Sequence, residues 1–225
     1  MRIVKIIAFF VIAICATLHC NAKDYNFEVG QFEKIKINGN VSLVYKCLPD
    51  SAGYIRYSAG EGNESLFVFN VKKDGTLKIQ LGADNWNNKD LPVIYAYSAA
   101  LLSIESSSEL TVTVESVSPC PSFKVNQIGN GSISVEDIKS NEVSASISTG
   151  NGAIYLSGRC EDASFNMVGS GLISADRLAA DNVKIKGVGT GSIGCWAVDN
   201  LNIKCIGTTK IYYKGNPNIK KIGRR

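Results

Sequence analysis

Few side chains in this 225-residue chain could carry out catalysis, because it contains a single histidine. That histidine, His19, lies in an N-terminal segment that we expect to be removed, which excludes Ser-His-Asp and Cys-His nucleophilic sites from the mature protein. Two carboxylates, Glu136 and Asp176, occupy equivalent positions of a repeat and would lie about 9.6 Å apart at strand spacing. This separation is near the upper limit for an inverting glycosidase. Single matches of this kind are common among acidic turn residues, so we expect no catalytic residue.

Five cysteines remain once the N-terminal segment is removed: Cys47, Cys120, Cys160, Cys195 and Cys205. An odd number leaves at least one thiol without a partner in the chain. The irregular spacing matches no zinc or haem motif, and we expect no metal and no cofactor. Cys195 and Cys205 align with apolar positions of the repeat, where a free cysteine packs as a small hydrophobic residue. An oxidising compartment leaves a disulfide open as the alternative.

Residues 1–22 are predicted to be a secretory signal peptide. Arg2 and Lys5 form a basic start, residues 6–18 are apolar, and Cys20 and Ala22 are small residues at the positions that a signal peptidase reads. The apolar run is too short to span a bilayer. The alternative is a lipoprotein modified at Cys20, which the bulky His19 before it disfavours. We therefore expect an exported protein of the periplasm, cell surface or medium, without a transmembrane segment.

Charge is unevenly distributed along the mature chain. Residues 23–181 contain 13 basic and 19 acidic residues, whereas residues 182–225 contain nine basic residues and a single acid, Asp199. The basic end either contacts an anionic glycan, a lipid phosphate or an acidic partner, or is a solvated cap that prevents end-to-end stacking. The candidate residues for contact with an anionic surface are Lys214, Lys220, Lys221, Arg224 and Arg225.

The second half of the chain contains a repeat of about 20 residues that carries the motif Gly-x-Gly. Successive copies begin 18 to 21 residues apart, and the last is degraded to Gly207-Thr208-Thr209. A glycine-free copy, Ser106-Ser107-Ser108, precedes the others. The four complete copies contain Gly129, Gly131, Gly150, Gly152, Gly169, Gly171, Gly189 and Gly191. Such a period predicts a solenoid in which each repeat buries its apolar face on its neighbours.

Apolar residues recur at fixed positions around each motif. The position four residues after the first glycine is isoleucine in all five copies: Ile133, Ile154, Ile173, Ile193 and Ile211. The position four residues before it is Val125, Phe165, Ile185 or Ile203, and in the second copy a shift of one residue brings Ile147 there. Because these residues alternate with polar ones, we expect short parallel strands stacked in register, with the isoleucines in one buried column.

We interpret the glycines as corners between strands, since glycine tolerates positive φ and close backbone approach. A phosphate-binding loop would need a helix after the motif, whereas strand-like segments follow here. A calcium-binding β-roll would need an aspartate ligand where Ile133 and its equivalents stand.

Residues 23–100 are expected to form a less regular β part of the same domain. Asn38-Gly39 and Asp74-Gly75 each separate two apolar-alternating segments and so predict a hairpin or a corner. No segment shows a sustained period of 3.6 residues, so we expect no substantial helix. The predicted organisation is a signal peptide (1–22) and one β-helix domain (23–225), with regular coils over 101–217 and a basic tail over 218–225.

Three aromatic residues are candidates for contact with a glycan. Trp86 lies in a polar loop, and Tyr95 and Tyr97 alternate on one face of a strand, where they could stack on a sugar ring. The simpler interpretation is that these tyrosines cover the face of a sheet.

Several segments resemble the putative auto-transporter adhesin head, GIN domain family of Bacteroides-like bacteria. They are the run QFEKIKINGNV of residues 31–41, DGTLKI of residues 74–79, LLSI of residues 101–104 with its serine triplet, and the Gly-x-Gly coils ending in YKGNP at residues 213–217. The resemblance covers residues 27–217 and implies a right-handed, single-stranded parallel β-helix on an exported protein. It supplies no catalytic residues.

We therefore expect a non-enzymatic, adhesin-like or cell-envelope interaction module whose partner is an unknown protein or glycan and not a nucleic acid. The alternative is a carbohydrate-binding or polysaccharide-cleaving β-helix. Cleavage is disfavoured because coils of about 20 residues leave no room for the long loops that would build a catalytic groove.

Overall fold

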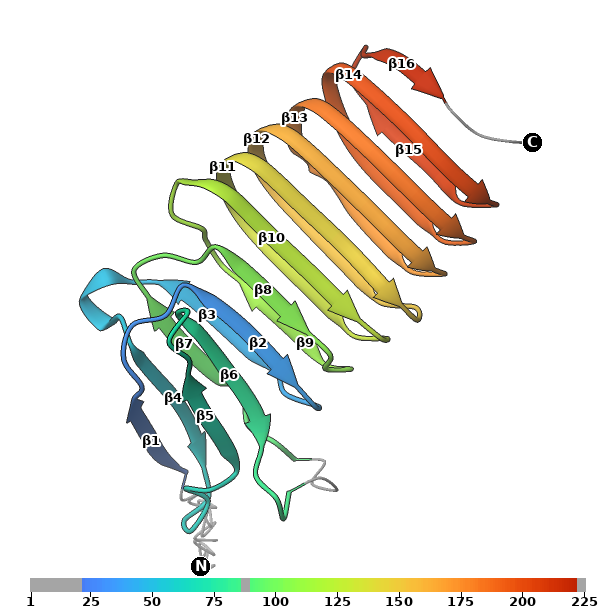
Figure 1. Cartoon of the computed structure of the whole chain (residues 1–225). Helices are drawn as coiled ribbons and strands as arrows, with labels where there is room; N and C mark the ends of the chain where they lie inside the picture. Colours follow the sequence, from blue (N-terminus) through green and yellow to red (C-terminus); the bar gives the residue numbers. More distant parts are fainter. Residues whose placement is uncertain (1–21, 86–89, 222–225) are drawn as a thin grey trace, which may run out of the picture.

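The computed structural model describes residues 22–85 and 90–221, and the regular secondary structure of this part of the chain is almost entirely β-strand (Figure 1). Its only helical element is a single 3-10 turn, η1 (Pro49–Ser51). The strands are β1 (Lys23–Glu28), β2 (Lys34–Asn38), β3 (Leu43–Cys47), β4 (Tyr54–Ala59), β5 (Phe67–Val71), β6 (Thr76–Leu81), β7 (Ile94–Ser98), β8 (Ser103–Ser106), β9 (Thr111–Val114), β10 (Cys120–Ile128), β11 (Ser132–Thr149), β12 (Ala153–Gly169), β13 (Leu172–Gly189), β14 (Ser192–Gly207), β15 (Lys210–Lys214) and β16 (Asn218–Lys221).

Each of the strands β11 to β14 forms nearly a whole coil of about 20 residues and bends once along its length. The first leg of β11 pairs in parallel with β9, and its second leg pairs in parallel with β10. Repetition of this pattern builds two sheets that face each other across the core (Figure 1). We call the sheet that contains β9 and β15 the first sheet, and the sheet that contains β10 and β16 the second sheet. The predicted solenoid of parallel, in-register strands is confirmed, whereas β11 to β14 are 16–18 residues long and not short, because each strand continues through the bend between its two legs.

The isoleucine column runs through the core of the first sheet. Ile133, Ile154, Ile173 and Ile193 follow one another in register and are completely buried. The fifth member, Ile211, is in register but only half-buried, because among the described strands β15 pairs with β14 alone. The prediction was therefore correct for the register and wrong for the burial of the last member.

The strand pairing in the second sheet shows that one prediction was wrong, namely that Ile147 aligns with Val125 and Phe165. Val125 pairs with Ala145, which in turn pairs with Phe165, whereas Ile147 pairs with Gln127 and Met167. Both Ala145 and Ile147 point inward, because alternate residues of a strand share a face. The register shift lies after Gln127, closer to the corner than the sequence suggested, and it accommodates the extra residue of this coil.

The two glycines of each motif meet different demands. The first has positive φ, for example 88° at Gly129 and 135° at Gly189. The second lies against the coil before it: a Cβ atom on Gly191 would be 2.2 Å from the carbonyl oxygen of Gly171. The earlier corner at residues 106–108 uses side chains instead, since Ser108 Oγ donates to the carbonyl oxygen of Val41 and accepts from its amide.

The N-terminal part continues both sheets with antiparallel strands. On the first sheet β1 pairs with β4 and β4 with β7, and on the second sheet β5 pairs with β6. Asp74-Gly75 forms the β5–β6 hairpin, whereas Asn38-Gly39 is a corner, because β2 and β3 belong to different sheets. Sequence signals alone did not distinguish these two outcomes.

The two ends of the solenoid differ in how they cover the core. At the N-terminal end, neighbouring aromatic rings pack with centroids 5.1–6.2 Å apart: Tyr25, Phe27, Tyr57, Phe67 and Phe69. At the C-terminal end, β15 and β16 leave apolar side chains exposed, including 46% of Tyr213 and 41% of Ile219. The C-terminal end is therefore not a purely polar cap.

Candidate binding surfaces

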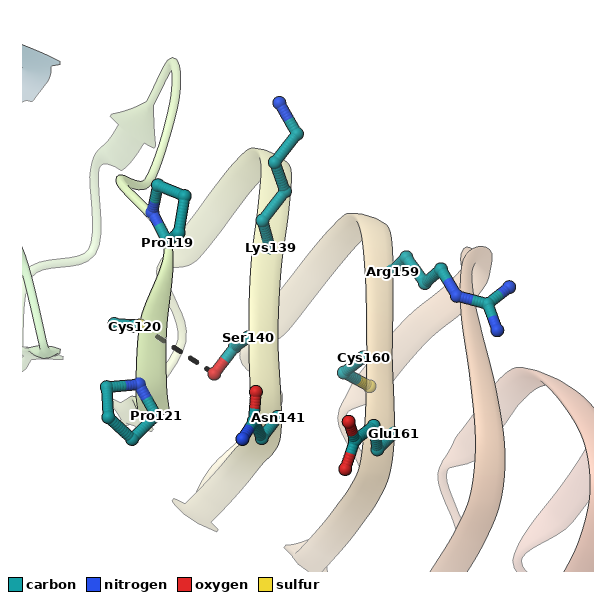
Figure 2. Close-up of a pocket in the computed structure, with 9 residues that line it drawn as sticks. All are labelled: Pro119, Cys120, Pro121, Lys139, Ser140, Asn141, Arg159, Cys160 and Glu161. Carbon is teal, nitrogen blue, oxygen red and sulfur yellow. Dashed lines mark hydrogen bonds between the residues drawn. The ribbon is translucent and has the colours of Figure 1, made fainter.

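A hollow of about 520 Å³ lies where the coils bend between their two legs (Figure 2). These bends run along the long edge of the solenoid opposite the glycine corners (Figure 1). Three successive coils supply its lining: Pro119, Cys120, Pro121, Lys139, Ser140, Asn141, Arg159, Cys160 and Glu161. Cys120, Ser140 and Cys160 are register neighbours, so they stand side by side along the hollow. The sequence analysis did not identify this site.

The Cys160 thiol of this hollow is not activated for nucleophilic attack. Burial raises the pKa of the Cys160 thiol to about 12, so it is protonated at neutral pH. Cys120 Sγ donates a hydrogen bond to Ser140 Oγ at 3.7 Å, and Ser140 Oγ donates onward to the carbonyl oxygen of Glu142. The five cysteines of residues 22–85 and 90–221 are all free thiols. This arrangement suits a structural role better than chemistry.

The cations of the hollow are directed elsewhere. Lys139 pairs with Asp137 at 3.0 Å, and Arg159 pairs with Asp181 at 3.0 Å. In Figure 2 both long side chains extend away from the thiols. The hollow therefore presents two proline rings and few converging polar groups to a ligand.

The outer face of the first sheet carries a continuous column of register neighbours. In spatial order it contains Arg56, Tyr95, Val44, Thr113, Ser134, Tyr155, Ser174, Gly194 and Tyr212. We call this set the tyrosine column. Four strand steps separate Tyr95 from Tyr155 and three separate Tyr155 from Tyr212, which correspond to about 19 Å and about 14 Å at strand spacing. Small or hydroxyl-bearing side chains occupy most of the positions between the rings.

The tyrosines of this column are accessible to different degrees. Tyr212 is 61% exposed and Tyr155 is 38% exposed. Tyr95 is half-buried, and two cations lie over its ring, Lys46 at 5.9 Å and Arg56 at 5.8 Å from the centroid. Tyr97 lies on the same face in the neighbouring column, opposite Tyr54.

A second hollow, of about 440 Å³, opens beside the C-terminal end of the tyrosine column. It is lined by Leu172, Ser174, Asp176, Ser192, Gly194, Cys195, Tyr212, Tyr213 and Lys214. Gly194 creates its floor, since a Cβ there would meet nothing closer than 3.9 Å. Unlike the corner glycines, Gly194 is not required by the backbone, and its effect is to leave space between Ser174 and Tyr212.

Asp176 is held as a charged group in this second hollow. Ser174 Oγ donates to Asp176 Oδ1 at 2.8 Å, and Lys214 Nζ lies 3.5 Å from Asp176 Oδ2. The hydrogen bond from Ser174, supported by Lys214, lowers the pKa of Asp176 below its ordinary value. An acid with a lowered pKa is poorly suited to protonate a leaving group, so Asp176 is better placed to accept hydrogen bonds.

The residues expected to contact an anionic surface are divided between the sheets. Lys214 belongs to the first sheet and is paired with Asp176, whereas Lys220 and Lys221 lie on β16 of the second sheet. Arg224 and Arg225 lie outside the described residues, as do Trp86 and residues 1–21 of the expected signal peptide.

Over residues 22–85 and 90–221 no group of three or more histidine, cysteine, aspartate or glutamate side chains could hold a metal ion. Within the same ranges, no helix has the length and apolar character needed to cross a membrane. The fold and its surfaces define a parallel β-solenoid with shallow, open hollows on its outer faces.

This chain belongs to the family described as "Putative auto-transporter adhesin, head GIN domain", whose model matches residues 31–217. Solved structures of bacterial proteins share the fold. A putative adhesin from Bacteroides fragilis NCTC 9343 has a TM-score of 0.72 at 21% identity, over 89% of this chain and 97% of the other. A protein from Parabacteroides distasonis ATCC 8503, described as a putative lipid binding protein, has a TM-score of 0.68 at 23% identity, over 91% and 95%. No curated protein is significantly similar in sequence to this chain.

Proposed function

We propose that the protein is an exported, non-enzymatic, adhesin-like module that binds an extended glycan along the tyrosine column. The observation that carries the proposal is the column itself, in which aromatic rings recur along one face of the sheet with mostly small side chains between them. A sugar ring can stack its apolar face on tyrosine, while its hydroxyls bond to neighbouring polar groups. The second hollow offers such groups beside Tyr212.

The chemistry of the second hollow supports binding to hydroxyl groups. Asp176 accepts hydrogen bonds, Lys214 donates them, and Ser174 and Ser192 can do both. The low floor at Gly194 leaves Tyr212 accessible from the side of Ser174. Repetition of rings along a rigid sheet favours a ligand with repeating units, because each additional contact is made without further ordering of the protein.

The groups with shifted pKa values in the described residues favour binding over cleavage. The Asp176 carboxyl has a lowered pKa, and the two fully buried thiols, Cys160 and Cys195, have raised ones. None of these shifts produces an acid or a nucleophile poised near neutral pH. The family match is consistent with an interaction module at the cell envelope.

A glycan array probed with residues 23–225, followed by calorimetric titration of the best ligand, tests the proposal. Tyr155→Ala and Tyr212→Ala should each weaken binding by about two- to tenfold, the range expected for loss of one stacking contact. Tyr155→Phe should retain most of the affinity, because the ring is kept. Gly194→Leu should fill the second hollow, since a Cβ atom at this position meets no atom closer than 3.9 Å.

Tyr54→Ala is the matched control, since Tyr54 is 43% exposed on the same sheet but lies outside the column. Equal losses from Tyr54→Ala and Tyr155→Ala would contradict a site on the column, and a ligand released as cleaved product would contradict the non-enzymatic role. Export is tested separately by the mass of the native protein, whose chain should begin at Lys23.

A further inference from the structure

The outer face of the second sheet, over its last coils, carries two adjacent sets of residues with different chemistry. One is an apolar column, Val168, Val188 and Ile206, which follow one another in register on β12, β13 and β14. The other is a group of four lysines beside it: Lys184, Lys186, Lys204 and Lys220. We call the combined surface the lysine-valine face. It lies on the sheet opposite to the tyrosine column.

The three side chains of the apolar column are each about half exposed or more. Val168 is 52% exposed, Val188 is 49% exposed and Ile206 is 65% exposed. A single exposed apolar side chain is ordinary, but three on consecutive strands form a continuous strip. Other outward positions of the same coils carry polar residues such as Asn166 and Asn202, so the strip is not a general property of this sheet.

The lysines lack acidic partners in the described part of the chain. None of the four forms an ion pair there, whereas Lys36, Lys46 and Lys139 of other coils do. Lys186 and Lys204 are direct register neighbours, and Lys184 and Lys220 flank Asn202 from either side. Like charges opposite each other on adjacent strands destabilise a sheet, so an anionic ligand would relieve a repulsion that the fold itself leaves uncompensated.

The same lysines surround a hollow of about 220 Å³, lined by Lys184, Ile185, Lys186, Asn202, Ile203, Lys204 and Lys220. Its polar groups are ammonium donors and one amide, with no carboxylate among them. Acidic residues of this face, Glu142 and Asp162, lie on earlier coils, and the positions that continue their column are Asn182, Asn200 and Asn218. Over residues 182–188 and 200–206 the charged side chains are thus all basic, and the same two segments carry Val188 and Ile206 of the apolar strip.

We propose that the lysine-valine face docks on an anionic phospholipid bilayer. Lysines attract the negative surface and pair with lipid phosphates, while Val168, Val188 and Ile206 enter the boundary between headgroups and acyl chains. A free polyanion would satisfy the lysines but would leave the apolar strip in water, and this is why a bilayer fits the whole face better. The proposal does not depend on glycan binding by the tyrosine column.

Cosedimentation of residues 23–225 with vesicles tests the proposal, and residues 1–22 are omitted because their apolar run would itself partition into lipid. Vesicles of phosphatidylcholine alone are compared with vesicles containing one-third phosphatidylglycerol, at low and high salt. We expect binding to the anionic vesicles only. The double variant Lys186→Gln/Lys204→Gln should weaken it by about 30-fold at low salt, since each lysine near an anionic surface contributes about 1 kcal/mol. Val188→Ser/Ile206→Ser should weaken it at both salt concentrations.

Matched controls come from the same sheet. Lys124→Gln alters an outward lysine of β10, and Val68→Ser alters a 45% exposed valine of β5, so both should leave binding unchanged. Equal binding to neutral vesicles, or unchanged binding by the lysine double variant, would overturn the proposal. So would full competition by inorganic phosphate or by a soluble anionic polysaccharide, because the site would then be an anion site and not a membrane face. Tyr155→Ala should bind vesicles normally, which separates this test from that of the glycan site.

Discussion

A comparison of two glycines of one coil tests the physical basis of the corners. Gly191 is the second glycine of its motif, and a Cβ atom there would lie 2.2 Å from the carbonyl oxygen of Gly171 and 2.7 Å from Met167 Sδ. Gly194 lies three residues later, and a Cβ atom added to it would meet no atom closer than 3.9 Å. Neither residue has positive φ, so alanine is compatible with the backbone conformation of both.

The two Gly→Ala substitutions should therefore have opposite signs. In Gly191→Ala the methyl group meets a backbone oxygen of the neighbouring coil, which cannot turn away as a side chain would. Overpacking of this kind costs about 3 kcal/mol. Gly194→Ala should instead stabilise the protein by about 0.5 kcal/mol, because it reduces the conformational freedom of the unfolded chain. The free energies of unfolding of the two variants should differ by about 3–4 kcal/mol.

Urea denaturation followed by circular dichroism measures the difference, and amide hydrogen exchange locates it. Exchange in Gly191→Ala should accelerate first in β13 and β14, the coils that its methyl group would force apart. If the two variants unfold within about 0.5 kcal/mol of each other, close approach is not the reason for the second glycine.

Three other expectations follow from burial. Ile173→Ala should destabilise the protein by about 2–5 kcal/mol in urea denaturation because it leaves a cavity between coils, whereas Ile211→Ala should cost far less, since that residue is half-buried. Burial raises the pKa of the Cys160 thiol to about 12 and that of the Cys195 thiol to about 11. Both thiols should therefore resist alkylation at neutral pH until the chain is unfolded, which mass spectrometry would measure. Burial raises the pKa of Tyr57 from 10.0 to about 12, so with rising pH the unfolded chain loses this proton before the folded chain does. The free energy of unfolding should therefore fall as the pH rises from 10 to 12, and Tyr57→Phe should flatten that part of the pH profile.

The repeat predicted the register of the coils because, when coils of equal length lie on one another, equivalent positions of successive repeats become neighbours. Ile133, Ile154, Ile173 and Ile193 could be aligned by counting alone, and they pair as counted. Counting failed where a coil contains an extra residue, since both Ala145 and Ile147 satisfy the inward pattern and only the pairing of the strands decides between them.

The candidate sites were less predictable because they consist of outward-facing residues, and the repeat does not determine which residue types occupy outward positions. Tyr95 could be singled out by alternation within its strand, but its place in a column with Tyr155 requires that β3 lie between β7 and β9. Those pairings join segments that are far apart in the sequence. The outward residues Tyr155 and Tyr212 carried one available signal, their positions one residue after members of the isoleucine column.

The basic character of residues 182–225 shows how the fold converts a linear property into two surfaces. Read along the chain, it suggests a charged end of a rod. In the structure each coil contributes one leg to each sheet, so Lys214 lies on the first sheet beside Asp176, while Lys186 and Lys204 lie on the second sheet without an acidic partner in the described ranges. Because the inner faces of the sheets pack on each other, their outer faces point in opposite directions. A bilayer on the lysine-valine face would therefore leave the tyrosine column directed away from the membrane, where a glycan could reach it.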